Sequence, residues 1–330
     1  MGKRLGNTQL FIIFGILVFI YGVYRYINAK KGENTFHTHI IPKIDSAKVN
    51  GMLIYTSAKK GEPMRFTLKD KKWMITQSGY TTLADDKAES YVIEQIRQIS
   101  PDRLATSDPA QWKDFNVMDT MGTRLVLLNN TDTLLYVIVG RFGFNPQGRQ
   151  GISYMRLHGQ NEVYGVEGFL ALNITQDADS WRNRRTVSQD EHSWSKLTFT
   201  YPGDSSYIVQ KDSNDRWHFG DNKKVDSLGT ATTIHEMAMQ NYGKFAYKFD
   251  TNSVKPIYTL LIEGRSISPI LIKAYPDAAE KLVITSSINP GAYFSEAKSK
   301  MFDKLFPGKN SFLHHVMPKK NSVAAATKKK

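Results

Sequence analysis

The residues whose types and spacing could most readily do chemistry are three arginines that follow Trp181. Arg182, Arg184 and Arg185 place three guanidinium groups within a stretch of four residues. Guanidinium groups bind phosphate and carboxylate through paired hydrogen bonds, so this cluster is a candidate contact for an anionic glycan, a lipid headgroup or a partner protein. The other interpretation is a connector between two folded units, in which these arginines pair with nearby acids.

Two other segments resemble known motifs but lack their decisive residues. Residues 143–150 have the glycine spacing of a phosphate-binding loop, yet arginine and glutamine replace the lysine and the hydroxyl residue that phosphate and magnesium require. We expect a glycine-rich hairpin loop there instead. His235 and Glu236 begin a His-Glu-x-x-His pattern, but Met239 stands at the second histidine position, which leaves too few zinc ligands.

The remaining clusters of titratable residues are two histidine pairs and two aspartate pairs. They are His37 with His39, His314 with His315, Asp85 with Asp86, and Asp177 with Asp179. The histidines lack a carboxylate cluster that would complete a metal site. The aspartates are interpreted as helix-start and loop residues, and a glycosidase pair stays open because sequence spacing does not give separation in space. The sequence thus predicts no catalytic, cofactor-binding or metal-binding residues, no cofactor and no enzymatic activity.

Composition narrows the function further. The chain has no cysteine, which excludes disulfides, cysteine nucleophiles and thiolate metal sites. Ten of its thirteen net positive charges lie in residues 1–31 and 316–330, which contain no acid. Between these ends bases exceed acids by only three, so the folded part has no basic face of the kind that binds nucleic acid. We expect no nucleic-acid partner.

Residues 10–27 form an apolar stretch with a single charge, Arg25. As a helix it would be about 27 Å long, close to the ~30 Å hydrocarbon core of a bilayer. We predict a transmembrane anchor here, between a basic flank at residues 1–9 and a linker at residues 28–43. A cleaved secretory signal is the alternative, although its only candidate cleavage site is Ile27-Asn28-Ala29, in which Ile27 is too large for the first position of a small-x-small motif. Positive charges are balanced on the two sides, so they do not set the orientation.

A pattern of strands followed by a helix occurs twice after the linker. Trp73 and Trp217 each begin the second strand of a hairpin and are 144 residues apart, and Asp85 and Asp226 each precede a helix and are 141 residues apart. Asp85 or its neighbour Asp86 is the expected N-cap of the first helix. The repeated order predicts an internal duplication.

The expected fold is α+β, with a single N-terminal transmembrane helix followed by two duplicated units of mostly antiparallel sheet that carry helices on one face. The first unit is expected at residues 44–180 and the second at residues 194–310. A connector at residues 181–193 joins them, and a basic low-complexity tail at residues 311–330 follows.

The chain resembles the bacterial DUF4340 family, whose members look like membrane-anchored proteins with duplicated units. The resemblance covers about residues 45–310 and is carried by short markers in a fixed order. They are Phe66 to Trp73, Ala84-Asp85-Asp86, Trp112 to Val117, Val139-Gly140, Gly151 and Tyr154, Val163-Tyr164, and Trp181-Arg182. Phe115-Asn116-Val117 departs from the Tyr-Gly-Leu-like turn of the family.

The resemblance implies an extracytoplasmic accessory role, because the family's genes often neighbour those of ABC-type exporters and gliding-motility-like auxiliary proteins. We therefore expect a non-enzymatic, membrane-anchored accessory or scaffold protein of a bacterial envelope complex. It would cross the inner membrane once, with its C-terminal units in the periplasm, and its partners would be the bilayer and an integral-membrane or envelope protein complex. An envelope hydrolase of glycan or peptide, and a module that binds an anionic glycan or lipid, stay open as alternatives.

Overall fold

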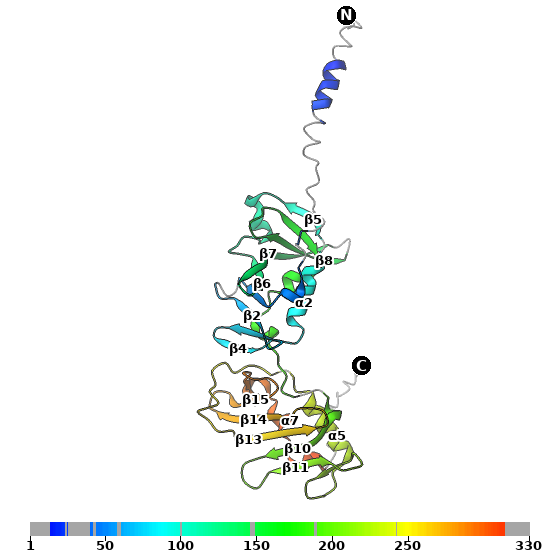
Figure 1. Cartoon of the computed structure of the whole chain (residues 1–330), viewed down its shortest axis with the longest axis vertical. Coiled ribbons are helices and arrows are strands. Elements are labelled where there is room, and N and C mark those ends of the chain that lie inside the picture. The colour runs from blue at the N-terminus through cyan, green and yellow to red at the C-terminus, as the bar shows by residue number, and fades with distance from the viewer. Residues whose placement is uncertain are drawn as a thin grey trace, which may run out of the picture.

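The computed structural model describes residues 14–23, 25, 40–41, 44–57, 61–99, 101–145, 149–187, 190–241 and 243–313. These residues form an α+β protein with two antiparallel sheets and a few short helices (Figure 1). The predicted fold class is confirmed at this level.

The first sheet has nine strands in the order β4-β3-β2-β1-β6-β7-β8-β9-β5. Its strands are β1 (Gly51–Tyr55), β2 (Met64–Lys69), β3 (Lys72–Gln77), β4 (Tyr80–Leu83), β5 (Pro101–Thr106), β6 (Thr123–Asn129), β7 (Asp132–Asn145), β8 (Gln150–Leu157) and β9 (Val163–Glu167). The helices of this unit are η1 (Ser46–Lys48), α2 (Ala88–Arg97), η2 (Pro109–Phe115), α3 (Leu170–Asn173) and α4 (Ala178–Trp181).

The second sheet has seven strands in the order β12-β11-β10-β13-β14-β15-β16. Its strands are β10 (Trp194–Thr200), β11 (Tyr207–Lys211), β12 (Trp217–Phe219), β13 (Tyr258–Gly264), β14 (Ile270–Asp277), β15 (Lys281–Ser286) and β16 (Phe294–Ser295). The helices are η3 (Glu191–Ser193), α5 (Ser227–Ala238), α6 (Glu296–Ser299), α7 (Phe302–Leu305) and η4 (Lys309–Phe312).

The two sheets share one strand order. Seven consecutive strands of the first sheet, from β3 through β1 to β9, correspond in sequence order and neighbours to the seven strands from β12 through β10 to β16. Helix α2 lies between β4 and β5, and α5 lies between β12 and β13, so each long helix falls in the same gap of the strand order. Strands β4 and β5 are additions at the two edges of the first sheet. This architecture fits a repeat.

The repeat markers occupy matching places, with one correction. Trp73 lies on β3 and Trp217 on the corresponding β12. Asp226 caps α5, where its carboxylate accepts a hydrogen bond from the Gly229 N–H at 2.6 Å. The prediction that Asp85 or Asp86 caps α2 is wrong, because Lys87 is the N-cap. The Asp85 N–H donates to the Trp181 carbonyl at 2.8 Å, which holds Asp85 beside β4 and delays the helix start.

Alternation along the strands builds the cores. In β2, Met64 and Phe66 are buried while Arg65 and Thr67 are exposed, as expected when side chains alternate between the faces of a sheet. The buried residues belong to the main core of the first unit, to which α2 contributes Val92. The second unit has a separate core around Trp194, Leu197 and Phe199 of β10.

A second, smaller apolar cluster in the first unit brings several of the family markers together. The turn after η2 has Asn116 in the left-handed region (φ 56°), and Gly140 of β7 lies directly against it. A Cβ atom on Gly140 would stand 2.0 Å from the Phe115 carbonyl oxygen. The buried Arg156 completes the turn by donating from Nε to the Val117 carbonyl at 2.7 Å.

Other expectations for the first unit have mixed outcomes. Strands β7 and β8 flank residues 146–148, so the glycine-rich segment connects a hairpin as predicted and does not begin a helix. Strand β5, which follows α2 directly, was not predicted.

The predicted anchor lies only partly within the described residues. Residues 14–23 are helical. Among the residues that the structure describes, no helix combines the length and the apolar character needed to cross a membrane. Residues 1–9, most of the linker with His37 and His39, and residues 314–330 with His314 and His315 lie outside the described residues.

Replacing Gly140 with alanine tests the tight packing of this turn. Since the new methyl group would collide with backbone, we expect Gly140→Ala to lower the free energy of unfolding by about 3 kcal/mol. Gly308→Ala is the matched control, because a Cβ atom there meets nothing within 4 Å. Its effect should stay within about 0.5 kcal/mol in urea denaturation. Equal effects of the two substitutions would contradict the close approach at Gly140.

Candidate functional site

The two units meet at a junction that is organised by Arg182. Figure 1 shows β4 at the end of the first unit that faces the second. The residues after α4 run along the free edge of β4, where Ala84 and Arg182 form an antiparallel bridge and the Asn183 N–H donates to the Leu83 carbonyl at 2.9 Å. The chain that leaves the first unit therefore extends its sheet before it enters the second.

The Arg182 side chain is 2% exposed, and its guanidinium group donates hydrogen bonds to acceptors on two strands, β3 and β4. Its Nη1 donates to the Ile75 carbonyl at 3.2 Å and to Thr82 Oγ1 at 2.9 Å. Its Nη2 donates to the Tyr80 carbonyl at 3.1 Å. Asp179 Oδ1 lies 3.4 Å from Nε and supplies the compensating charge. Burial lowers the pKa of Arg182 and Asp179 opposes that shift, so the guanidinium stays charged at neutral pH.

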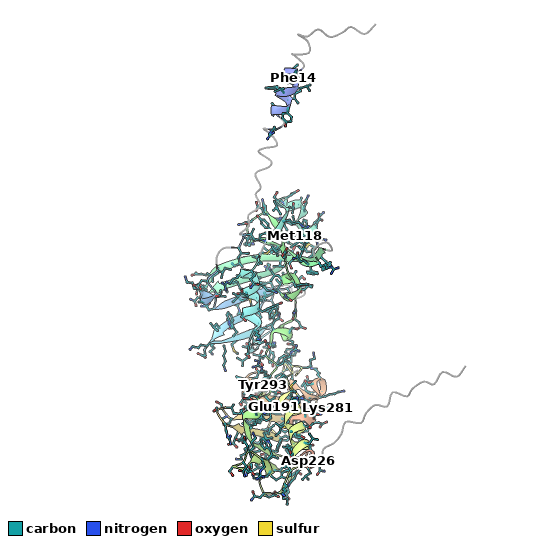
Figure 2. The ribbon with its side chains drawn as sticks, turned by 90° about the vertical axis from the view of Figure 1, so that its right-hand side faces the viewer. Phe14, Met118, Glu191, Asp226, Lys281 and Tyr293 are labelled. Carbon is teal, nitrogen blue, oxygen red and sulfur yellow. The ribbon has the colours of Figure 1, made fainter. Side chains whose placement is uncertain are left out.

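Tyr80 connects this arrangement to the second unit. Its strand belongs to the first sheet, but its ring belongs to the core of the second unit. The ring packs edge-on against Phe245 and Tyr247, with centroids 6.1 and 5.2 Å away. The Arg182 guanidinium lies 4.7 Å from the same ring. The Tyr293 N–H donates to the Tyr80 hydroxyl at 3.1 Å, and Figure 2 shows Tyr293 at the end of the second unit that faces the first.

Polar contacts from the second unit fix the connector itself. The buried Asn289 donates from Nδ2 to the carbonyls of Asn183 (2.8 Å) and Arg185 (3.2 Å). Thr186 donates its hydroxyl to the Gln240 carbonyl. Backbone groups of the connector are thus paired with both units, which is the condition for burying a chain segment at an interface.

The three predicted arginines share one small cavity but have different surroundings. Together with Asp85, Ser180 and Asn241 they line a cavity of about 390 Å³. Arg185 pairs with Asp86 at 2.8 Å and is half-exposed. Arg184 donates from Nε and Nη2 to the Asp179 carbonyl, at 3.1 and 2.8 Å. Arg182 is used inside the junction, so contact with an external anion or partner stays a prediction for Arg184 and Arg185.

A larger cavity of about 540 Å³ opens on another side of the junction. The first unit supplies the ends of β2, β3 and β4 together with α4, and the second unit supplies Tyr247 and Lys248. Tyr247 donates its hydroxyl to the Asp179 carboxylate. Asp177 caps α4, and its Oδ1 accepts from the N–H and the hydroxyl of Ser180 at 2.9 and 2.8 Å. Burial raises the pKa of Asp177, but the Ser180 hydrogen bonds and the charges of Arg184 and Lys244 together outweigh burial, so the pKa lies below its ordinary value.

Sequence reasoning did not single out Gln77, Tyr80, Tyr247 or Asn289. The partners of Tyr80, Tyr247 and Asn289 are far away in the chain, and no local pattern marks any of the four residues. The available signal was the Trp181-Arg182 marker, since an arginine directly after a buried tryptophan is costly to place without acceptors. The predicted aspartates Asp177 and Asp179 do lie at the junction, although as a helix cap and an ion-pair partner.

A protein metal site needs several histidine or carboxylate ligands that converge on one point. In the part of the chain that the structure describes, no group of three or more histidine, aspartate or glutamate side chains is placed to hold a metal ion. His235, from the incomplete His-Glu-x-x-His pattern, contacts Glu191 through Nδ1 at 2.9 Å.

Comparison with known families adds one finding. The family model described as a domain of unknown function, DUF4340, matches residues 73–257, which is more than half of the chain. The chain belongs to the DUF4340 family. The match begins at Trp73 of β3 and runs through the junction to the start of β13, so it includes both Arg182 and Tyr80. No curated protein and no solved structure matches the chain.

Removing the Arg182 side chain should be far more costly than removing an exposed arginine. Arg182→Met leaves the Asp179 carboxylate and three acceptors without their donor, so we expect the free energy of unfolding to fall by about 3–5 kcal/mol. Arg216→Met is the control, because that side chain is 74% exposed beside Asp212 and should contribute less than about 1 kcal/mol. Similar losses in urea denaturation would show that Arg182 does not organise the junction.

The buried Tyr80 hydroxyl predicts a specific alkaline sensitivity. Burial raises its pKa to about 12, although the Tyr293 N–H and Arg182 act in the opposite direction. A raised pKa stabilises the folded state below the unfolded value of about 10, and this contribution, up to about 3 kcal/mol, is lost as the pH rises from about 10 to 12. Tyr80→Phe should therefore show a shallower fall of unfolding free energy over this range than the natural chain.

The comparison isolates Tyr80, because the other buried tyrosines are present in both proteins. Near neutral pH the variant should be less stable by about 1 kcal/mol, since it lacks the hydrogen bond from Tyr293. Parallel stability curves between pH 9 and 12 would mean that the Tyr80 hydroxyl is accessible to solvent.

Proposed function

We propose that this protein is a non-enzymatic, membrane-anchored accessory or scaffold protein of a bacterial envelope complex, such as an ABC-type export or gliding-like system. Residues 10–27 would anchor it in the inner membrane, with both units in the periplasm. The observation that carries the proposal is the junction, which joins two sheets of the same strand order through a buried arginine and a shared aromatic core. A rigid two-unit body on a short tether is suited to holding partners at a fixed distance from the membrane.

Partner contact through side chains agrees better with this body than strand addition. The free edge strand β5 carries Pro101, Asp102 and Arg103, and its register with β9 shifts twice. Proline, edge charges and irregular pairing are features that discourage another strand from joining a sheet. At the facing ends of the units, β4 pairs with the connector and β16 bridges to Phe245.

The alternative functions have less support from the same geometry. A glycosidase needs a protonated carboxylic acid, whereas the pKa of Asp177 is lowered and Asp179 is engaged by Arg182 and Tyr247. An anion-binding module needs unengaged cations, whereas Arg182 and Arg185 are paired with Asp179 and Asp86.

Placing charges in the apolar segment tests the anchor. Leu17→Lys combined with Val18→Lys should move the protein from the carbonate-resistant membrane fraction to the soluble fraction, because each lysine costs about 3 kcal/mol at the centre of a membrane helix. Leu68→Lys combined with Met118→Lys is the control, since both side chains are partly exposed, at 43% and 38%. The control should stay with the membrane.

Purification in a mild detergent tests the accessory role. We expect an integral-membrane protein to accompany the natural chain at near-stoichiometric levels. A phosphatase that is active only outside the cytoplasm, fused after residue 330, should be active. A protein recovered alone that degrades peptidoglycan or polysaccharide would contradict the proposal, as would a natural chain found in the soluble fraction.

A further inference from the structure

The larger junction cavity has the size of a small-molecule site. Its volume of about 540 Å³ falls within the ~300–1,000 Å³ range of ligand pockets, which occur preferentially where two domains meet. Both units contribute to its wall, so a bound ligand would contact both at once. The proposed scaffold function does not require such a cavity.

Gln77, at the end of β3, is the first indication of what the cavity would hold. The residue is 8% exposed and lines the cavity. Its carboxamide forms no hydrogen bond with the described residues and is not among their buried unpaired groups, so it is open to the cavity. A carboxamide that is open to a cavity and is not used by the fold is available to a hydrogen-bonding partner. Because a carboxamide both donates and accepts, that partner must offer both kinds of group.

Tyr247 supplies a flat apolar surface in the same cavity. The residue is 52% exposed, but its orientation is fixed by the hydrogen bond to Asp179 and by the edge-on contact with Tyr80. An aromatic ring held in this way offers its face for stacking while its polar end is already satisfied. The C–H face of a sugar ring matches such a surface.

The charges of the cavity wall cancel. Arg182 and Lys248 contribute two positive charges, and Asp177 and Asp179 contribute two negative charges. Only Oδ1 of Asp177 is used in capping α4, which leaves Oδ2 as an acceptor for ligand hydroxyl groups. Hydroxyl side chains of Thr56, Ser78 and Thr175 complete a wall rich in neutral hydrogen-bonding groups.

We propose that this cavity is a binding site for a neutral carbohydrate, in which Tyr247 stacks on a sugar ring while Gln77 and Asp177 bind its hydroxyl groups. Vicinal hydroxyls offer the donors and acceptors that Gln77 lacks, and an uncharged ligand agrees with the cancelled charges. A peptide would also pair with a carboxamide, so an uncharged blocked tripeptide is the competing probe.

Binding is tested with the full-length chain in a detergent that has no sugar headgroup. Maltotriose, cellotriose, chitotriose and mannotriose serve as probes, and saturation-transfer NMR with titration gives the affinities. We expect at least one of them to bind. Gln77→Met and Tyr247→Ala should each weaken that binding at least tenfold, whereas Gln160→Met, at an exposed turn position, should leave it unchanged.

Stability provides the second readout. Because Gln77 has no internal partner, Gln77→Met should keep or raise the free energy of unfolding while it weakens binding. A clear loss of stability in this variant would overturn the proposal, because it would show that Gln77 serves the fold. Binding of none of the four saccharides, or preferential binding of an uncharged blocked tripeptide, would overturn it as well.

Discussion

The structure depends on the burial of one guanidinium group. The Arg182 side chain is only 2% exposed, and a charge buried to this extent is tolerated only where acceptors and an opposite charge surround it. The strands β3 and β4 supply those acceptors, and Asp179 supplies the charge. The hydrogen bonds of Arg182 therefore hold the connector along β4 and close the edge of the first sheet. They also fix the position from which the Tyr80 ring enters the core of the second unit.

The repeat and the junction have different origins in the sequence. Alternation in β2 and the hairpin tryptophans are local patterns, so the repeated order of the strands could be predicted, whereas the added edge strands β4 and β5 could not. Asp226 also follows a local rule, and it caps α5 as expected. Asp85 follows the same rule in sequence but not in structure, because its backbone bonds to Trp181, a residue almost one hundred positions away.

The junction could not be predicted for the same reason. Arg182 reaches acceptors that are 100 to 107 residues earlier in the chain, and Tyr80 meets Tyr293 across 213 residues. Gln77 lies on the same face of β3 as Ile75, so in the sequence it resembles an ordinary strand residue. Only the structure shows that the second unit contributes to the wall of the cavity that Gln77 lines. The three arginines were found because charge density is visible in sequence, although their division into one buried and two peripheral groups is not.

The central claim is that the two units form one rigid body. Because the natural chain has no cysteine, Thr67→Cys on β2 and Thr200→Cys on β10 can carry one nitroxide label on each unit at exposed positions. Double electron–electron resonance on this pair should give a single narrow distance distribution, which broadens when Tyr80→Ala is added. A broad distribution in the protein with an intact junction would contradict the account.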